Sequence, residues 1–285
     1  MDPSYARQVW QLIETLHAVT YFADESRAAP ADLGLKGFWM GYFGCRAAPM
    51  GEVAPGVVHA TFFNFNEEMV QRAIPDAWSY ASAADLVTAR QAAAATALRR
   101  VVPEIDEVAD RILTLLWRVL DVAEPGGRPL FAANRDLEDP DDAVAELWQA
   151  TATLREHRGD GHVACLTSEG VGGCEAHVLF SATEGTPPEL LQQSRGWSAE
   201  EWHEAARFLR QAGLLDAEGE ATERGHRLRE QIERRTDELA VVPYSALDED
   251  QRDRLVAELT PAAQTVVRRD QIPFPNPIGL PPVVI

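Results

Sequence analysis

The sequence predicts a mainly α-helical protein with short β-hairpins, built from two tandem units that are related by internal duplication. Apolar residues recur at helical spacing along most of the 285-residue chain. A stretch rich in proline and glycine separates two halves in which similar segments follow in the same order. We therefore expect one unit at 1–120, a linker at 121–140 and a second unit at 141–240. A C-terminal helix and a proline-rich strap should occupy 241–285.

The predicted duplication rests on short matches between the halves. VWQLIETL at 9–16 aligns with LWQATATL at 147–154, and GLKG at 34–37 aligns with GVGG at 170–173. Identities are few, but the order of the matches and their nearly constant offset favour duplication over coincidence. Two similar helical units related by a pseudo-twofold axis would follow.

The first half should contain three to five helices. Periodic apolar residues predict a helix over 3–25, an alanine-rich helix over 81–100 and a further helix that opens at Pro103. Between them, VVHATFFNF at 57–65 is rich in β-branched and aromatic residues. This composition favours a strand or a buried apolar turn.

The second half contains the clearest structural motif. Ser198 and Glu201 form a capping box, and Gly213 suits the end of the helix that they start. LLDAEGEAT then has the composition of a short hairpin with Gly219 at its tip, and Thr222 caps a long helix through about residue 240. Helix, hairpin and helix in this order predict a winged helix-turn-helix, so we expect both units to be winged-helix-like.

The C-terminal end of the chain has a different composition. Residues 246–266 predict one or two short helices, and QIPFPNPIGLPPVVI after them carries five prolines. Proline spacing of this kind favours an extended strap rather than a helix. The apolar residues of the strap favour docking in a groove over disorder.

Two sets of segments resemble known proteins. RFLRQAGLLDAEGEATERGHRLREQIERRTDELA resembles the recognition helix, wing and dimer-type helix of MarR-like winged-helix regulators. LHAVTYFADESRAA, LGLKGFWMGYFGCRAAPMG, REHRGDGHVA and RGWSAEEW together resemble an actinobacterial family of helix-turn-helix, MarR-like proteins, over nearly the whole chain. This resemblance implies a fold but does not indicate a biochemical activity.

The charged residues of the chain include features that favour DNA binding and features that oppose it. The chain has 26 basic and 45 acidic residues, so its net charge of −19 repels polyanions unless a local basic patch exists. Arg207, Arg210 and Arg224 of the predicted motif are the residues we expect to contact DNA. Acidic residues lie between and beside them: Glu200, Glu201, Glu204, Asp216, Glu218 and Glu220. A DNA-binding regulator and a winged helix used for protein interaction therefore both stay open.

A polar cluster, REHRGDGH at 155–162, lies where an amphipathic helix is expected to end at Gly159. His157, Arg158, Asp160 and His162 could form the floor of a pocket that recognises a carboxylate, phenol or phosphate. Alternatively, the arginines complement the helix C-terminus and the aspartate pairs with a neighbouring arginine.

Aromatic residues suggest the walls of such a pocket. His17 and Tyr21 share one face of the first helix and are predicted either as core residues or as ligand contacts. The region 38–65 has the highest aromatic density in the chain, which is typical of a core or of a hydrophobic cavity between the halves. The residues assigned to this cavity are Trp39, Tyr42, Phe43, Phe62 and Phe63.

Metal and catalytic chemistry have less support. His157, His162, Cys165, Cys174 and His177 have spacings that zinc could use, but both cysteines lie in apolar runs where a thiol acts as a hydrophobe. We therefore expect neither a metal nor a cofactor. The chain has no nucleophile elbow, Walker loop or dinucleotide fingerprint, so we assign no catalytic residue and leave enzymatic activity open.

The expected location and function follow from these features. An odd number of cysteines, no secretory signal and no apolar run of membrane-spanning length predict a cytoplasmic protein that does not enter membranes. We predict a small-molecule-responsive winged-helix transcriptional regulator, either monomer or homodimer, with DNA and an aromatic or hydrophobic small molecule as partners. The alternative is a ligand-binding or sequestering protein, related to natural products, that does not bind DNA.

Overall fold

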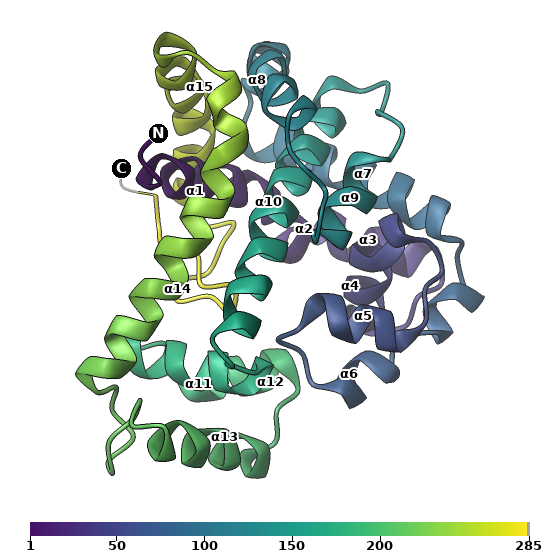
Figure 1. Ribbon diagram of the computed structural model, residues 1–285. Helices are drawn as coiled ribbons and strands as arrows, with labels where there is room; N and C mark the ends of the chain where they lie inside the picture. The colour runs from purple at the N-terminus through teal and green to yellow at the C-terminus, as the bar shows by residue number, and fades with distance from the viewer. Residues whose placement is uncertain (284–285) are drawn as a thin grey trace.

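The computed structural model describes residues 1–283, and helices make up all of their regular secondary structure. One helix, α10, runs through the middle of the molecule, and others surround it (Figure 1). The longer helices are α1 (Ser4–His17), α7 (Ala83–Val101), α8 (Ile105–Asp121), α10 (Ala143–Ser168), α14 (Glu223–Val241) and α15 (Glu249–Arg268).

Helix α10 organises the fold because most of its residues are buried among other helices. It packs against α1, α7, α8 and α14, and against α9 (Pro129–Arg135), which lies inside the predicted linker. Asp142 caps its start by accepting a hydrogen bond from the backbone N–H of Ala145 at 2.8 Å. The helix does not end at Gly159 as expected but continues to Ser168, since its carboxyl half packs on α14.

The main hydrophobic core draws on both halves of the chain. It begins at Ala6 in α1, includes Trp148 in α10, and reaches Leu280 in the C-terminal strap. The predicted division of the chain at 121–140 stays a prediction. The expected first helix is interrupted after His17, and the chain continues as α2 (Val19–Phe22) and α3 (Asp24–Asp32).

A second core, rich in aromatic residues, lies beside the first. Its elements are α4 (Gly37–Ala47), η1 (Ala48–Met50), α5 (Pro55–Phe62), α6 (Glu67–Gln71) and η2 (Asp76–Ser79). The expected strand in 57–65 is wrong, because Pro55 starts a helix that runs to Phe62. Phe63 then turns the chain with a φ of 45°.

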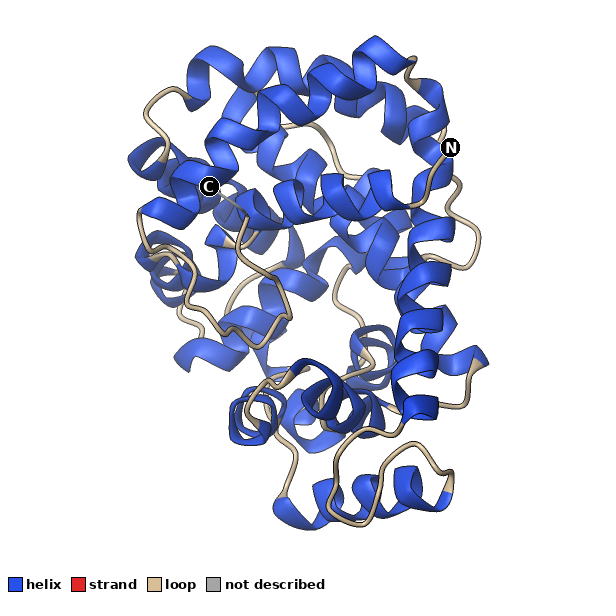
Figure 2. Cartoon of the chain, turned by 90° about the vertical axis from the view of Figure 1, so that its left-hand side faces the viewer, coloured by secondary structure: helices blue, strands red, loops and turns tan. Residues whose placement is uncertain are grey.

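The prediction of two winged-helix-like units with β-hairpins is wrong. Within residues 1–283 there is no strand, and Figure 2 shows helices joined by loops. The expected wing is a loop with one isolated antiparallel bridge between Leu215 and Ala221. A ladder cannot extend from this bridge, because Thr222 follows at once as the N-cap of α14. The first half contains no such loop, and α1 and α10, which carry the best repeat match, pack on each other in one core.

The capping residues expected at the helix-turn-helix are confirmed. Three helices, α11 (Gly173–Glu184), α12 (Pro188–Arg195) and α13 (Ala199–Gln211), share a separate core. Ser198 and Glu201 form the capping box of α13, and the preceding turn uses Gly196 at a φ of 77°. Helices α12 and α13 thus form a helix-turn-helix, with α11 packed across α13.

The C-terminal segment docks on the protein, as its apolar residues predict. After η3 (Val242–Ala246) and α15, residues 271–283 have no regular structure. Ile272, Asn276 and Leu280 are buried. The side chain of Asn276 bonds to both backbone groups of Leu280, which closes the strap into a compact loop.

Replacing Gly225 by alanine should destabilise the protein by about 1–3 kcal/mol, because the added Cβ would overlap the backbone carbonyl of Leu214. The matched control is Gly56→Ala in α5, where nothing lies within 4 Å and the helix gains up to about 1 kcal/mol. Urea denaturation measures both. Equal stability of the two variants would contradict the close contact between α14 and the loop before it.

Candidate functional site

A cavity of about 530 Å³ lies between the central helices and the C-terminal strap. Its walls come from α1, α4, α5, α10, α11, α12 and α14, and residues 274–282 of the strap cover part of it. Figure 1 shows this yellow strap beside α1, α14 and α10. The volume falls in the range of small-molecule binding sites.

The structure brings together only part of the predicted ligand set. Tyr42, Phe62, Arg158, Asp160 and His162 line this cavity. The remaining predicted residues lie elsewhere.

His17 and Tyr21 line a separate small cavity of about 50 Å³. Phe43 is fully buried in the aromatic core, and Trp39 packs against that core. Phe63 packs on a small cluster between α10 and α14. His157 meets the ring of Phe131, with the two centroids 4.9 Å apart.

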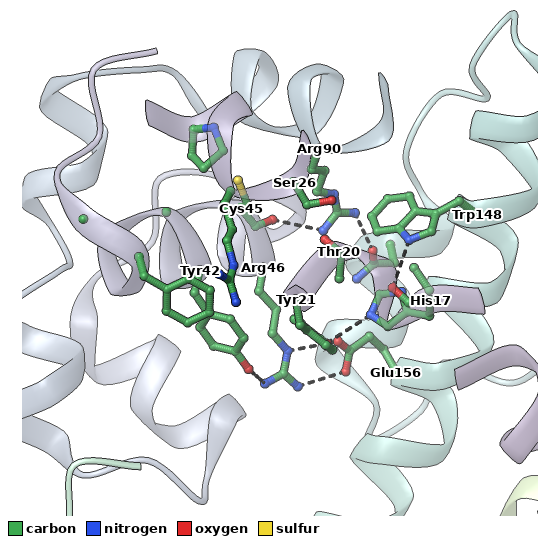
Figure 3. Close-up of a pocket in the computed structure, with 17 residues that line it drawn as sticks. His17, Thr20, Tyr21, Ser26, Tyr42, Cys45, Arg46, Arg90, Trp148 and Glu156 are labelled. Atoms are coloured by element: carbon green, nitrogen blue, oxygen red, sulfur yellow. Dashed lines mark hydrogen bonds and ion pairs between the residues drawn. The ribbon is translucent and has the colours of Figure 1, made fainter. Parts of the chain in front are cut away.

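The small cavity is built around a buried histidine (Figure 3). His17 stacks on Trp148, and its Nε2 lies 3.0 Å from the hydroxyl of Tyr21. The indole of Trp148 donates to the backbone carbonyl of His17 at 3.2 Å. Burial lowers the pKa of His17 well below its usual value, so this histidine is neutral at physiological pH.

One wall of the large cavity is a buried network of alternating charges. Arg46 donates two hydrogen bonds to Glu156, at 3.0 and 3.1 Å, and Arg155 donates to Glu156 at 2.8 Å and to Glu14 at 3.2 Å. Burial alone would raise the pKa of Glu156, but Arg155 and Arg46 lower it to about 2. The carboxylate therefore stays charged and joins α1, α4 and α10.

The polar cluster of α10 continues this wall toward α14. Arg158 contacts Glu233 and Asp237, both at 2.9 Å. His162 lies 3.0 Å from the hydroxyl of Thr236, and burial lowers its pKa to about 4. Among the described residues Asp160 forms no ion pair with an arginine, so the pairing expected for it is not found.

Asp160 instead caps α9 from outside that helix. One carboxylate oxygen accepts hydrogen bonds from the backbone N–H groups of Leu130 and Phe131 at 3.0 and 2.9 Å. Burial raises the pKa of Asp160 to about 6. Its role in the fold is therefore structural, although its side chain also faces the cavity.

The sequence does not indicate Arg195 as a cavity residue, and it indicates His177 only as a possible zinc ligand. Arg195, the last residue of α12, donates to the carbonyl of Pro277 at 2.6 Å and lies over the ring of Phe65. Burial lowers its pKa to about 10. No local signal could identify this arginine, because its neighbours come from distant parts of the chain.

Only one ring nitrogen of His177 has a hydrogen-bond partner among the described residues. Its ring bonds to the backbone carbonyl of Asn64, and its Nε2 is buried with no partner in residues 1–283. Burial lowers its pKa to about 3. The part of the chain that the structure describes contains no group of three His, Cys, Asp or Glu side chains arranged to hold a metal. Nor is any described helix long and apolar enough to span a membrane.

The predicted DNA-contacting arginines separate into two roles. Arg207 and Arg210 are exposed on α13, where Arg207 pairs with Glu204 at 2.9 Å. Arg224 instead donates to the carbonyl of Ala212 at 2.8 Å, so it ties α14 to the end of α13. The exposed face of α13 also carries Glu200.

Helices α11–α13, with the tight turn at Gly196, define a helix-turn-helix protein. The chain belongs to the Helix-turn-helix family, whose family model matches residues 6–273. The match therefore includes the helices around the cavity as well as the motif itself. No curated protein and no solved structure matches the chain. The finer resemblance to MarR-like regulators and the actinobacterial source stay predictions.

Replacing Glu156 by glutamine should lower the free energy of unfolding by about 3 kcal/mol, because it leaves two buried arginines facing a neutral amide. The matched control is Glu223→Gln, which breaks an exposed pair with Arg227. This control should show no measurable change, since exposed pairs contribute little. Urea denaturation tests both variants, and a stable Glu156→Gln protein would contradict the structural role of the network.

Acidification from pH 7 to pH 5 should destabilise the protein by at least about 2 kcal/mol. His157 and His177 have folded-state pKa values of about 3, below the usual 6.5, so below pH 6.5 the unfolded state binds more protons. Asp160 opposes this loss by about 1 kcal/mol, because its pKa of about 6 lets the folded state gain a proton in the same range.

Denaturation curves at several pH values measure this effect. The variant His177→Leu should show a smaller loss between pH 7 and pH 5 than the wild-type protein. A loss of the same size in both proteins would show that this histidine is not buried in its neutral form.

Proposed function

We propose that this protein is a helix-turn-helix transcriptional regulator whose DNA binding responds to a small molecule held in the large cavity. The observation that carries the proposal is that α11 and α12 belong both to the motif and to the cavity wall. A ligand that moves these helices changes the position of α13. Membership of the Helix-turn-helix family supports DNA as the partner of α13.

Two buried leucines connect the cavity to the motif. Leu179 in α11 and Leu191 in α12 line the cavity. Both also belong to the core that includes Trp202 and Leu209 of α13. Because cores of this kind are close-packed, a ligand that displaces either leucine requires α13 to adjust.

The segment 64–66 makes a second connection. The carbonyl of Asn64 accepts a hydrogen bond from the indole of Trp197 at 3.1 Å, and the side chain of Asn66 donates to Glu201 at 2.7 Å. The backbone N–H of Asn66 donates to the carbonyl of Arg195 at 2.9 Å. Asn64 and Phe65 also line the cavity, so the same segment touches a bound ligand and the turn before α13.

A second function is favoured by the charge of the motif. Glu200 and Glu204 lie on the exposed face of α13, and the loop that follows carries Asp216, Glu218 and Glu220. Carboxylates at these positions oppose contact with phosphates. The alternative is therefore a protein that binds or sequesters a small molecule and does not bind DNA.

DNA binding is tested by incubating the purified protein with a library of genomic fragments at low salt and sequencing the bound fraction. We expect enrichment of specific sites, and Arg207→Ala with Arg210→Ala should weaken binding to an enriched duplex about tenfold or more. Arg254→Ala is the matched control, because Arg254 is also an exposed, ion-paired arginine but lies on α15. The absence of enriched fragments would favour the second function.

A further inference from the structure

The charge of the cavity differs from that of the whole chain. Six arginines and five carboxylic acids line it, whereas the chain as a whole has 26 basic and 45 acidic residues. Basic groups are therefore concentrated around the cavity. The six lining arginines are Arg7, Arg46, Arg155, Arg158, Arg195 and Arg229.

Arg195 differs from the other five. Each of those makes an ion pair with at least one of Glu14, Glu156, Glu233 and Asp237. Within residues 1–283 Arg195 makes no ion pair, and its bonds go to the carbonyls of Ser194 and Pro277. Its exposed fraction is 9%, so this cation is buried without a counter-charge. Such burial is unfavourable until an anion compensates it.

His177 provides a second unsatisfied group beside Arg195. Its exposed fraction is 7%, it lines the cavity, and its Nε2 lacks a partner among the described residues. The other ring nitrogen bonds to the carbonyl of Asn64, so Nε2 carries the lone pair and accepts a hydrogen bond. A ligand hydroxyl or N–H group satisfies it. The positive charge of Arg195 contributes to keeping this ring neutral.

Apolar groups complete the site. The rings of Phe62 and Phe65 line the cavity and lie 6.4 Å apart, and Trp10 and Phe180 line it at other positions. The strap closes over this region, with Pro277 held by Arg195. A ligand body that packs on these rings excludes water from the charged end, which strengthens the contact with the guanidinium.

We propose that the cavity binds an apolar organic monoanion, with its carboxylate on Arg195 and a hydroxyl or N–H group donating to Nε2 of His177. One uncompensated arginine matches one negative charge, which favours a carboxylate over a phosphate dianion. The inference rests on the proposed function only in that it takes this cavity as the ligand site. Binding can be measured without DNA.

The test uses isothermal titration calorimetry on the full chain with 2-naphthoate, 4-hydroxy-2-naphthoate and the methyl ester of each. We expect the acids to bind and the esters to bind at least tenfold more weakly, because charge-assisted hydrogen bonds are the stronger ones. The hydroxylated acid should bind more tightly than the unsubstituted acid. If no acid binds, or if acids and esters bind equally, the proposal is wrong.

Two variants test which side chain binds the carboxylate and which one accepts the hydroxyl hydrogen bond. Arg195→Gln should weaken binding of both acids about tenfold or more and leave the esters unchanged. His177→Phe should remove the advantage of the hydroxylated acid and leave 2-naphthoate unchanged. Arg254→Gln on α15 is the control for loss of an arginine. An unchanged affinity for the acids in a folded Arg195→Gln protein, shown by its thermal unfolding, would exclude this arginine as the anchor.

The outcome is separable from that of the DNA experiment. Carboxylate binding without DNA binding would support the proposed carboxylate site and contradict the proposal that the protein is a DNA-binding regulator. DNA binding, with equal affinities for acids and esters, would support the proposed regulator and contradict the proposed carboxylate site.

Discussion

The buried carboxylate of Glu156 holds together three parts of the chain that are distant in sequence. It lies on α10, accepts hydrogen bonds from Arg46 of α4, and is joined through Arg155 to Glu14 of α1. Each of these charges would be costly to bury alone, and each is compensated by its neighbours. The positions of α1, α4 and α10 therefore depend on one another, and so does the shape of the cavity wall.

The cavity and the helix-turn-helix are connected because they share elements. Helices α11 and α12 present one face to the cavity and another to α13, and the segment 64–66 bonds to the turn before α13. A close-packed core transmits a displacement at one side to the other. This arrangement would let a bound molecule influence a surface that it does not touch.

The distribution of arginine explains why composition alone is a poor guide to partners. Several of the 26 basic residues are buried in ion pairs within the protein, among them Arg46, Arg155 and Arg158. Their charges are compensated inside the protein by Glu14, Glu156, Glu233 and Asp237, so these arginines are not available to contact phosphates. Affinity for DNA would consequently depend on exposed arginines such as Arg207 and Arg210 on α13.

Local sequence signals predicted the helix-turn-helix well and the cavity only in part. The capping box at Ser198 and the cap at Thr222 depend on residues close in sequence, and the structure confirms them. The docking of the proline-rich tail is also confirmed, but it depends on distant residues such as Arg195. The predicted wing is wrong. The composition of 214–222 favours a hairpin turn, but it does not determine how many residue pairs the two sides form, and here a single bridge is followed at once by the cap of α14. Arg158, Asp160 and His162 of the polar cluster line the cavity, whereas His157 lies against Phe131, and their role as ligand contacts stays a prediction.

What the sequence determined by itself is the helical character of the chain, the position of the motif and the residues that cap its helices, because periodicity and capping act over a few residues. Tertiary structure decided which charges are compensated. Arg195 and His177 are unremarkable in the sequence, and they become a site only because α11, α12 and the strap bury both beside Phe65 without supplying a carboxylate. Long-range packing sets that balance of charge, and no pattern of neighbouring residues encodes it.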